Sequence, residues 1–245
     1  LRSQALARMQ EAVAAAPERG DLWAHLAYSC YALAARRNQL HQDPGPVFRT
    51  GERAVEMALQ LSPQDWRGPW YGTLLAMSEA LDLNLRALDA RPPARRGAAW
   101  AQRALDLGGH GAVRFARGAC LTHLAVAQLV HGEEPGEALA AAQQVLKEAV
   151  AQVPTDLVLR VNTSDLAVTQ AQVLHFLGQD ASATRAWAGA LLEGVPADDR
   201  LRALAHLKVE LLGVRLAGGR QRPEQLEDLS NRIRAFERAH QLPMP

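Results

Sequence analysis

Five segments of this chain share one pattern of small, apolar and polar positions. In "ALARMQEAVAAAP", at 5–17, a small residue is followed four positions later by an apolar residue and three positions after that by alanine. Spacing of four and then three residues keeps these positions on one face of an α-helix. The pattern therefore predicts a helix in each segment. The other four copies are 51–63, 97–109, 142–154 and 183–196.

The last shared position is alanine in every copy, and its spacing indicates a repeat. The column consists of Ala12, Ala58, Ala104, Ala149 and Ala190. Successive members lie 46, 46, 45 and 41 residues apart, which is within the range of helical solenoids. Small residues on a helix face let a neighbouring backbone approach closely. We therefore expect tight helix contacts at Gly51 and Gly97, which occupy the first shared position of their copies.

Another helix is predicted after each copy, because each of these stretches is long and amphipathic. It forms the first helix of a hairpin, and the following copy forms the second. Segments rich in turn-forming residues, such as "HQDPGP" at 41–46, connect each of these helices to the next copy. Aspartates that follow the copies are expected to be N-caps; they are Asp21, Asp65, Asp156 and Asp198. The predicted first helices of the hairpins are 21–39, 66–88, 111–130, 156–177 and 198–216.

The repeated unit is thus a helical hairpin, and it predicts an all-α fold. We expect one domain over 1–245, an α-solenoid in which about five antiparallel hairpins form a right-handed superhelix. A helix at 223–240, with an apolar stripe that includes Leu226 and Phe236, is expected to cap the C-terminal end. Because the first copy lacks a preceding partner helix, we also expect that the chain belongs to a longer protein.

The spacing small-x3-bulky-x2-Ala-x4-Pro resembles the second-helix signature of the tetratricopeptide repeat (TPR). "LWAHLAYSCY", with Trp23, Leu26 and Ala27, looks like the first-helix signature, and "LGQDASATRAWAGALL" at 177–192 is the closest match. The other copies have longer first helices or loops, which lengthen the period beyond the usual 34 residues. Long-period arrays of this kind also resemble the C-terminal regions of some large bacterial Ser/Thr kinases.

The resemblance implies a protein-binding or peptide-binding scaffold without catalysis of its own, whose first helices line a concave groove. In such a groove arginine can bind a carboxylate through two hydrogen bonds, and tyrosine can pack against a ligand at little entropic cost. By resemblance, the groove residues are Asp21, Tyr28, Tyr31, Tyr71, Ser78, Arg114, Arg117, Asn162, Asp165 and Thr169.

Other interpretations of the same residues stay open. Tyr28 and Tyr31 also fit a role in hairpin packing, and the stripe that begins at Asn162 also fits a solvated helix face. The whole array could be an architectural or self-associating module of a larger protein. It could also be an accessory subunit that holds a small molecule inside the superhelix.

Charge and cysteine content narrow the classes of partner. The 27 basic and 26 acidic residues nearly cancel, so there is no large basic field to bind a nucleic acid. No apolar run is long enough to span a bilayer, and we expect no membrane insertion. Cys30 and Cys120 lie in apolar helical runs and are expected to be buried structural thiols. A cytoplasmic location fits, and a periplasmic one stays open.

No motif for catalysis, metal binding or phosphate binding is found. The eight histidines are scattered, without the His-Glu-x2-His spacing of a zinc site. The glycines at 108–111 do not follow a strand, so we interpret them as a helix end and not as a phosphate loop. We therefore expect no catalytic residue, no metal and no cofactor.

Overall fold

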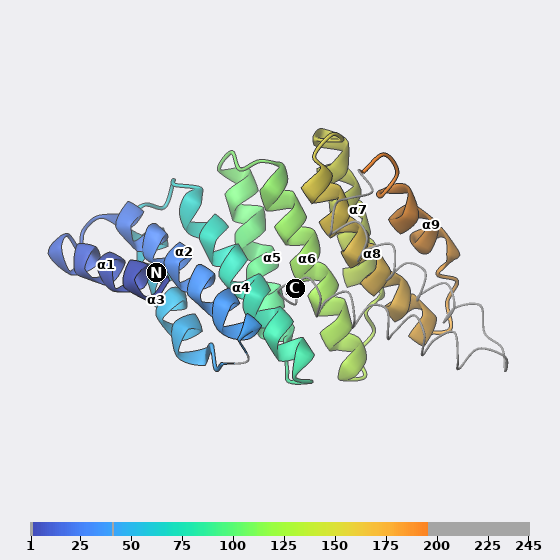
Figure 1. The fold of residues 1–245 in the computed structure, drawn as a ribbon, viewed down its shortest axis with the longest axis horizontal. Helices are drawn as coiled ribbons and strands as arrows, with labels where there is room; N and C mark the ends of the chain where they lie inside the picture. The colour runs from blue at the N-terminus through green and yellow to red at the C-terminus, as the bar shows by residue number, and fades with distance from the viewer. Residues whose placement is uncertain (1, 41, 196–245) are drawn as a thin grey trace. The chain divides into compact units, whose positions relative to one another are not determined.

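The structure is a computed structural model that describes residues 2–40 and 42–195. These residues form helices joined by short turns, and no strand occurs among them (Figure 1). The chain divides into two units, 1–149 and 150–245, and each is described by itself. The helices are α1 (Arg2–Ala15), α2 (Gly20–Gln39), α3 (Gly45–Leu61), α4 (Arg67–Leu85), α5 (Arg91–Asp106), α6 (Gly111–Val130), α7 (Gly136–Gln152), α8 (Leu157–Phe176) and α9 (Ser182–Ala190).

The observed helices match the predicted hairpin pattern closely. α6 has the predicted bounds, and α2, α4 and α8 differ from theirs by one to three residues at an end. The second helices α3, α5 and α7 begin six residues before the shared pattern, within segments predicted to be connections, and α9 ends at Ala190 although its copy runs to 196. Prolines in the first turn of α3 and α5 are compatible with the earlier start of these two helices, since an N–H there has no intrahelical partner.

The predicted aspartate caps are only partly correct. Asp156 caps α8, because its side chain accepts a hydrogen bond from the Leu159 N–H at 3.0 Å. Asp21 instead lies within the first turn of α2, where its carboxylate binds Arg19. Asp65 lies one residue before the N-cap position of α4, and its carboxylate accepts a hydrogen bond from the Arg67 N–H at 3.0 Å. Asp198 and the helices predicted at 198–216 and 223–240 lie outside the described residues.

In the first unit consecutive helices from α1 to α6 pack against one another, and α4 also packs against both α2 and α6. α2 contacts α1, α3 and α4, and α4 contacts α5 and α6. Figure 1 shows α2, α4 and α6 following one another along this unit. The pattern of contacts fits a repeat of helical hairpins.

Glycine and alanine permit these helices to approach one another. A Cβ at Gly51 would lie 2.6 Å from Leu75 Cδ2, and a Cβ at Gly97 would lie 2.6 Å from Cys120 Sγ. Both distances are far inside van der Waals contact, so the expected tight contacts at these glycines are confirmed. The alanine column is fully buried at its three central positions, half-buried at Ala12 and exposed at Ala190.

The second unit contains α8 and α9, which pack through small side chains. Ala167 and Ala171 on α8 form an apolar cluster with Ala188 on α9, and Trp187 covers its edge. The buried Ser164 hydroxyl donates to the Ala188 carbonyl at 2.8 Å, which links the two helices. Along the described parts of the chain, no helix is both long enough and apolar enough to cross a membrane.

Candidate functional site

Four ring-bearing side chains meet on one face of the first unit. Tyr28 and Tyr31 on α2, Tyr71 on α4 and His25 on α2 form what we call the aromatic surface. The ring centroids of Tyr28 and Tyr71 are 5.0 Å apart, those of His25 and Tyr71 5.9 Å, and those of Tyr28 and Tyr31 6.0 Å. These separations are typical of interacting aromatic rings. Three of the residues predicted to line a groove are thus brought together.

The packing of α2 against α4 places these rings side by side. His25 and Tyr28 are three residues apart and therefore share a face of α2, and Tyr71 approaches them from α4. Tyr28 is 45% exposed, whereas Tyr31 and Tyr71 are half-buried against the core around Leu26 and Leu75. The aromatic surface is therefore rigid at its base and accessible at its centre.

The hydroxyl groups of Tyr31 and Tyr71 keep their protons at neutral pH. Burial raises the pKa of Tyr31, and to a smaller extent the neighbouring Tyr28 raises it further. Burial also raises the pKa of Tyr71, with Arg67 opposing the shift. Because an uncharged phenol can both donate and accept a hydrogen bond, the two residues can add polar contacts to an apolar one.

Two ion pairs lie at the N-terminal ends of α2 and α4, next to the aromatic surface. Arg19 binds Asp21 at 2.6 Å, and Arg67 binds Asp65 at 2.7 Å. The hydrogen bonds from these arginines lower the pKa of both carboxyl groups, so each acid is ionised at neutral pH. The negative charge of Asp21 acts on the pKa of Asp65 in the opposite direction, as the smallest of the contributions.

Ser78 does not belong to an accessible site. Its side chain is only 7% exposed and lies within the packed interior of α4. The resemblance placed Ser78 in the groove, but serine is small enough to be buried between closely packed helices. A spacing of seven residues brings it close to the face of Tyr71, yet burial depends on the neighbouring helix and not on the spacing alone.

Two further groove predictions, Arg114 and Arg117, are half-buried on α6. The Arg117 Nε atom is buried and has no hydrogen-bond partner among the described residues. The remaining predictions, Asn162, Asp165 and Thr169, lie on α8 in the second unit. Asn162 is exposed, and the Thr169 hydroxyl donates to the Asp165 carbonyl at 3.2 Å.

His25, Asp65 and Arg67 are parts of this site that were not predicted from the sequence. A usable signal was present, because His25 precedes Tyr28 by three residues and Arg67 precedes Tyr71 by four. Each pair therefore shares a helix face. What could not be read from the sequence is that α2 and α4 present these two faces to the same patch of surface.

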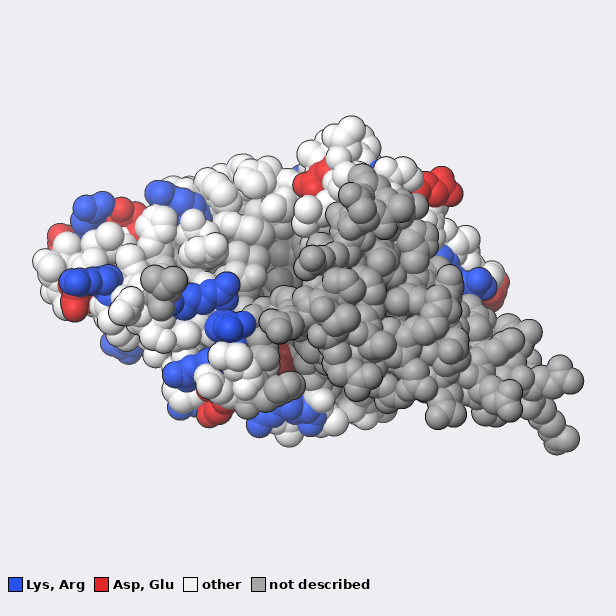
Figure 2. All heavy atoms as spheres, viewed as in Figure 1, with Lys and Arg blue, Asp and Glu red and all other residues white. Residues whose placement is uncertain are grey.

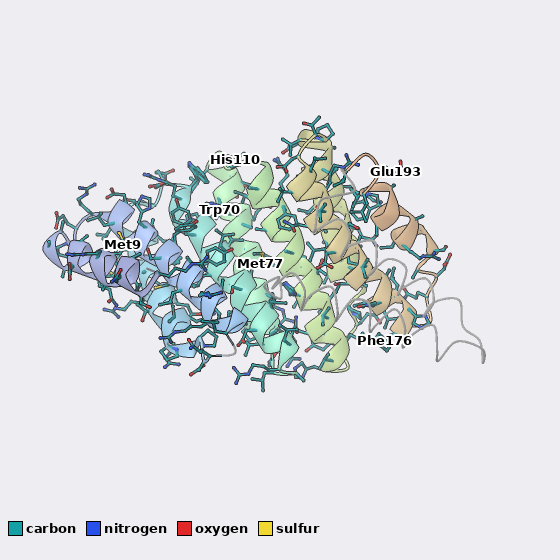
Figure 3. The ribbon with its side chains drawn as sticks, in the orientation of Figure 1. Met9, Trp70, Met77, His110, Phe176 and Glu193 are labelled. Carbon is teal, nitrogen blue, oxygen red and sulfur yellow. The ribbon has the colours of Figure 1, made fainter. Side chains whose placement is uncertain are left out.

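Trp66 and Trp70, at the start of α4, are packing residues. Trp66 and Trp70 cover a buried cluster of Ala101, Ala104 and Val113. In Figure 3, Trp70 lies at the end of α4 that is nearer to His110. The ring centroids of Trp66 and His110 are 5.3 Å apart. None of these rings is part of the aromatic surface.

Charged side chains are sparse on the visible face of the first unit (Figure 2). Arginines are scattered over the visible face of the first unit, and much of the surface there is uncharged (Figure 2). Within the described ranges, no cluster of three histidine, cysteine or acidic side chains could hold a metal ion. Comparison with protein-family models, with curated proteins and with solved structures gives no match.

Proposed function

We propose that this chain is a tetratricopeptide-like helical repeat that serves as a scaffold for binding a protein or peptide, with no catalysis of its own. The observation that carries the proposal is the aromatic surface, an exposed cluster of rings on two successive first helices. Tyrosine is enriched at binding sites because it offers a large contact area at low entropic cost. The repeat in the sequence and the neighbour-to-neighbour helix packing support the architecture.

The chemistry of the surface indicates what kind of segment it binds. The rings offer an apolar contact, and the hydroxyl groups add hydrogen bonds. Asp21 and Asp65 are already neutralised by their arginines, so the site has no strong net charge. We therefore expect a ligand segment with aromatic or apolar side chains and few charges.

The test is an affinity capture from the source lysate with matched variants. The double variant Tyr28→Ala and Tyr71→Ala removes the centre of the surface. Val158→Ala is the control, because Val158 is an apolar residue that is 61% exposed on α8 and lies outside the aromatic surface. Equal helical content must first be shown by circular dichroism. Loss of one specific partner with the double variant alone supports the proposal, and retention of that partner contradicts it.

Self-association is a second candidate that a separate observation favours. An exposed apolar residue lies at the C-terminal end of α2, of α4 and of α6. These residues are 45 positions apart in the sequence: Leu40, Leu85 and Val130. Phe176 occupies the same position on α8 and lies at the end of that helix (Figure 3). Such residues are costly to expose. Light scattering over a range of concentrations tests this candidate, with Leu85→Glu and Val130→Glu expected to abolish any dimer.

A further inference from the structure

A cleft lies between α1 and α3, with α2 as its floor. Its volume is about 630 Å³, and it is open to solvent along one side. Val13 and Ala14 form the α1 wall, Trp23 and Leu26 form the floor, and Arg49 and Arg53 lie along the α3 wall. Because the exposed lining is mainly apolar, filling the cleft with apolar side chains would remove hydrophobic surface from water.

The floor of the cleft is suited to an apolar side chain. The Trp23 indole N–H already donates to the Pro17 carbonyl at 2.8 Å, so the ring offers only apolar surface to a ligand. Leu26 and Val13 are both held in the core of the first unit. The floor is therefore preformed, and a ligand would not have to order it.

The two arginines on the wall have no ion-pair partner in the part of the chain that the structure describes. They are four residues apart on one face of α3, and both are exposed. The Asp43 carboxylate, which lies before α3, instead accepts from the Gly45 N–H at 2.9 Å. Two positive charges thus stand beside an apolar floor without compensation.

The next repeat lacks both features. Arg95 lies one repeat after Arg49, and it pairs with Glu133 at 3.5 Å. Above α4, the Trp100 ring and the Val55 side chain both come within 3 Å of where a Cβ on Gly72 would lie, so side chains close the space there. An open cleft beside unpaired arginines therefore distinguishes the first repeat from the second.

The lining of the cleft contains no residue of the aromatic surface. With 3.6 residues per turn, His25 and Tyr28 lie on one side of α2, and Trp23 and Leu26 lie on the opposite side. A ligand on one side does not contact the residues on the other. Loss of binding at the cleft would therefore leave the proposed function untouched, and the reverse also holds.

We propose that the cleft binds an acidic amphipathic helix from a partner protein. Apolar side chains of that helix would lie on Trp23 and Leu26, and its carboxylates would pair with Arg49 and Arg53. The two arginines are about 6 Å apart along α3, the same rise that separates carboxylates four residues apart on a ligand helix. Carboxylates paired with arginine form strong charge-assisted hydrogen bonds.

The experiment measures fluorescence polarisation with a set of labelled helical peptides of 18 residues. Each peptide carries a leucine stripe and two glutamates four residues apart, in different registers, and a matched set carries lysine in place of glutamate. The full chain is compared with the double variant Arg49→Glu and Arg53→Glu. Arg185→Glu is the control for charge, because Arg185 is exposed on α9 and far from the cleft in sequence.

A second pair of variants tests occupancy of the cleft without changing charge. Ala14→Leu fills the cleft from α1, whereas Ala15→Leu adds the same side chain outside the lining. Both positions are exposed, and leucine is a good helix former, so neither change should unfold α1.

We expect at least one glutamate peptide to bind the parent chain. The double variant Arg49→Glu and Arg53→Glu should bind that peptide about tenfold more weakly or worse, and it should bind the matched lysine peptide more tightly than the parent chain does. Ala14→Leu should weaken binding, and Ala15→Leu and Arg185→Glu should not. Equal binding of glutamate and lysine peptides, or no binding of any peptide, overturns the proposal. Saturable binding of dodecanoate in place of the peptides also overturns it and would assign the cleft to a small amphiphile.

Discussion

The Cys120 sulfur on α6 lies 2.6 Å from the point that a Cβ atom on Gly97 of α5 would occupy. The methyl group of Ala76 on α4 is only 3.1 Å from the same point. Three helices therefore meet at a position where any side chain would collide. A glycine in mid-helix lowers helix propensity by about 1 kcal/mol relative to alanine, and here that cost is offset by close packing.

We expect Gly97→Ala to destabilise the first unit by about 1–2 kcal/mol, since overpacking outweighs the gain in helix propensity. Cys120→Ala removes the sulfur that the new methyl group would meet. In that background Gly97→Ala should become nearly neutral. Chemical denaturation of the two single variants and the double variant gives the coupling energy. Additive effects of the two substitutions would show that the contact does not set the cost.

The pH dependence of stability should report on Glu79. Glu79 on α4 and Glu52 on α3 both bind Arg96 of α5. Burial, and then the charge of Glu52, raise the pKa of Glu79 above its ordinary value of 4.5, with Arg96 opposing the shift. The folded protein thus binds this proton more tightly than the unfolded chain does. The resulting stability is fully present below pH 4.5 and is lost as the pH rises through the raised pKa.

Glu79→Gln should therefore become more stable relative to the parent chain as the pH is raised from 4 to 7. Thermal unfolding at several pH values measures this difference. Glu137→Gln is the control, because Glu137 is exposed on α7, and it should show no such trend. A constant difference between Glu79→Gln and the parent would mean that Glu79 has the same pKa in both states.

The α8 cap in the second unit should contribute measurably to stability. Asp156→Ala removes the hydrogen bond to the Leu159 N–H and should cost about 1 kcal/mol. Asp156→Ser keeps an acceptor at the same position and should restore most of the loss. Native-state hydrogen exchange of the first amides of α8 measures how far each substitution changes the stability of that end of the helix. Equal protection in the alanine and serine variants would show that the cap is unimportant.

Both thiols should be inert in the folded protein. Cys30 and Cys120 are free and buried, as the sequence predicted, and burial raises the pKa of each to about 12. At pH 8 only about one thiol in ten thousand would then be ionised. Ellman's reagent should label neither residue until denaturant is added, and then both. Rapid labelling of the native chain would require an opening of the α2–α3 or α5–α6 packing.

Local features of the sequence were sufficient to predict the helices and their pairing into hairpins. The shared columns and the turn residues between them placed α6 correctly at both ends. They also predicted the tight contacts at Gly51 and Gly97, since a small residue on an apolar helix face indicates close packing even when the neighbouring helix is not known. The starts of α3 and α5 were misplaced, because proline fits both a connection and a first helical turn.

The candidate sites depended on contacts between helices, which the sequence does not encode one helix at a time. Periodicity put Tyr71 and Ser78 on similar faces of α4, yet one is accessible and the other is buried by its neighbours. The separation of α1 from α3 that opens the cleft likewise depends on how side chains fill the space over α2. The sequence by itself determined the repeated helical hairpins, because helix formation follows from local spacing and chemistry. Only the tertiary structure decided which side chains are exposed together, because that depends on the packing of helices from different repeats.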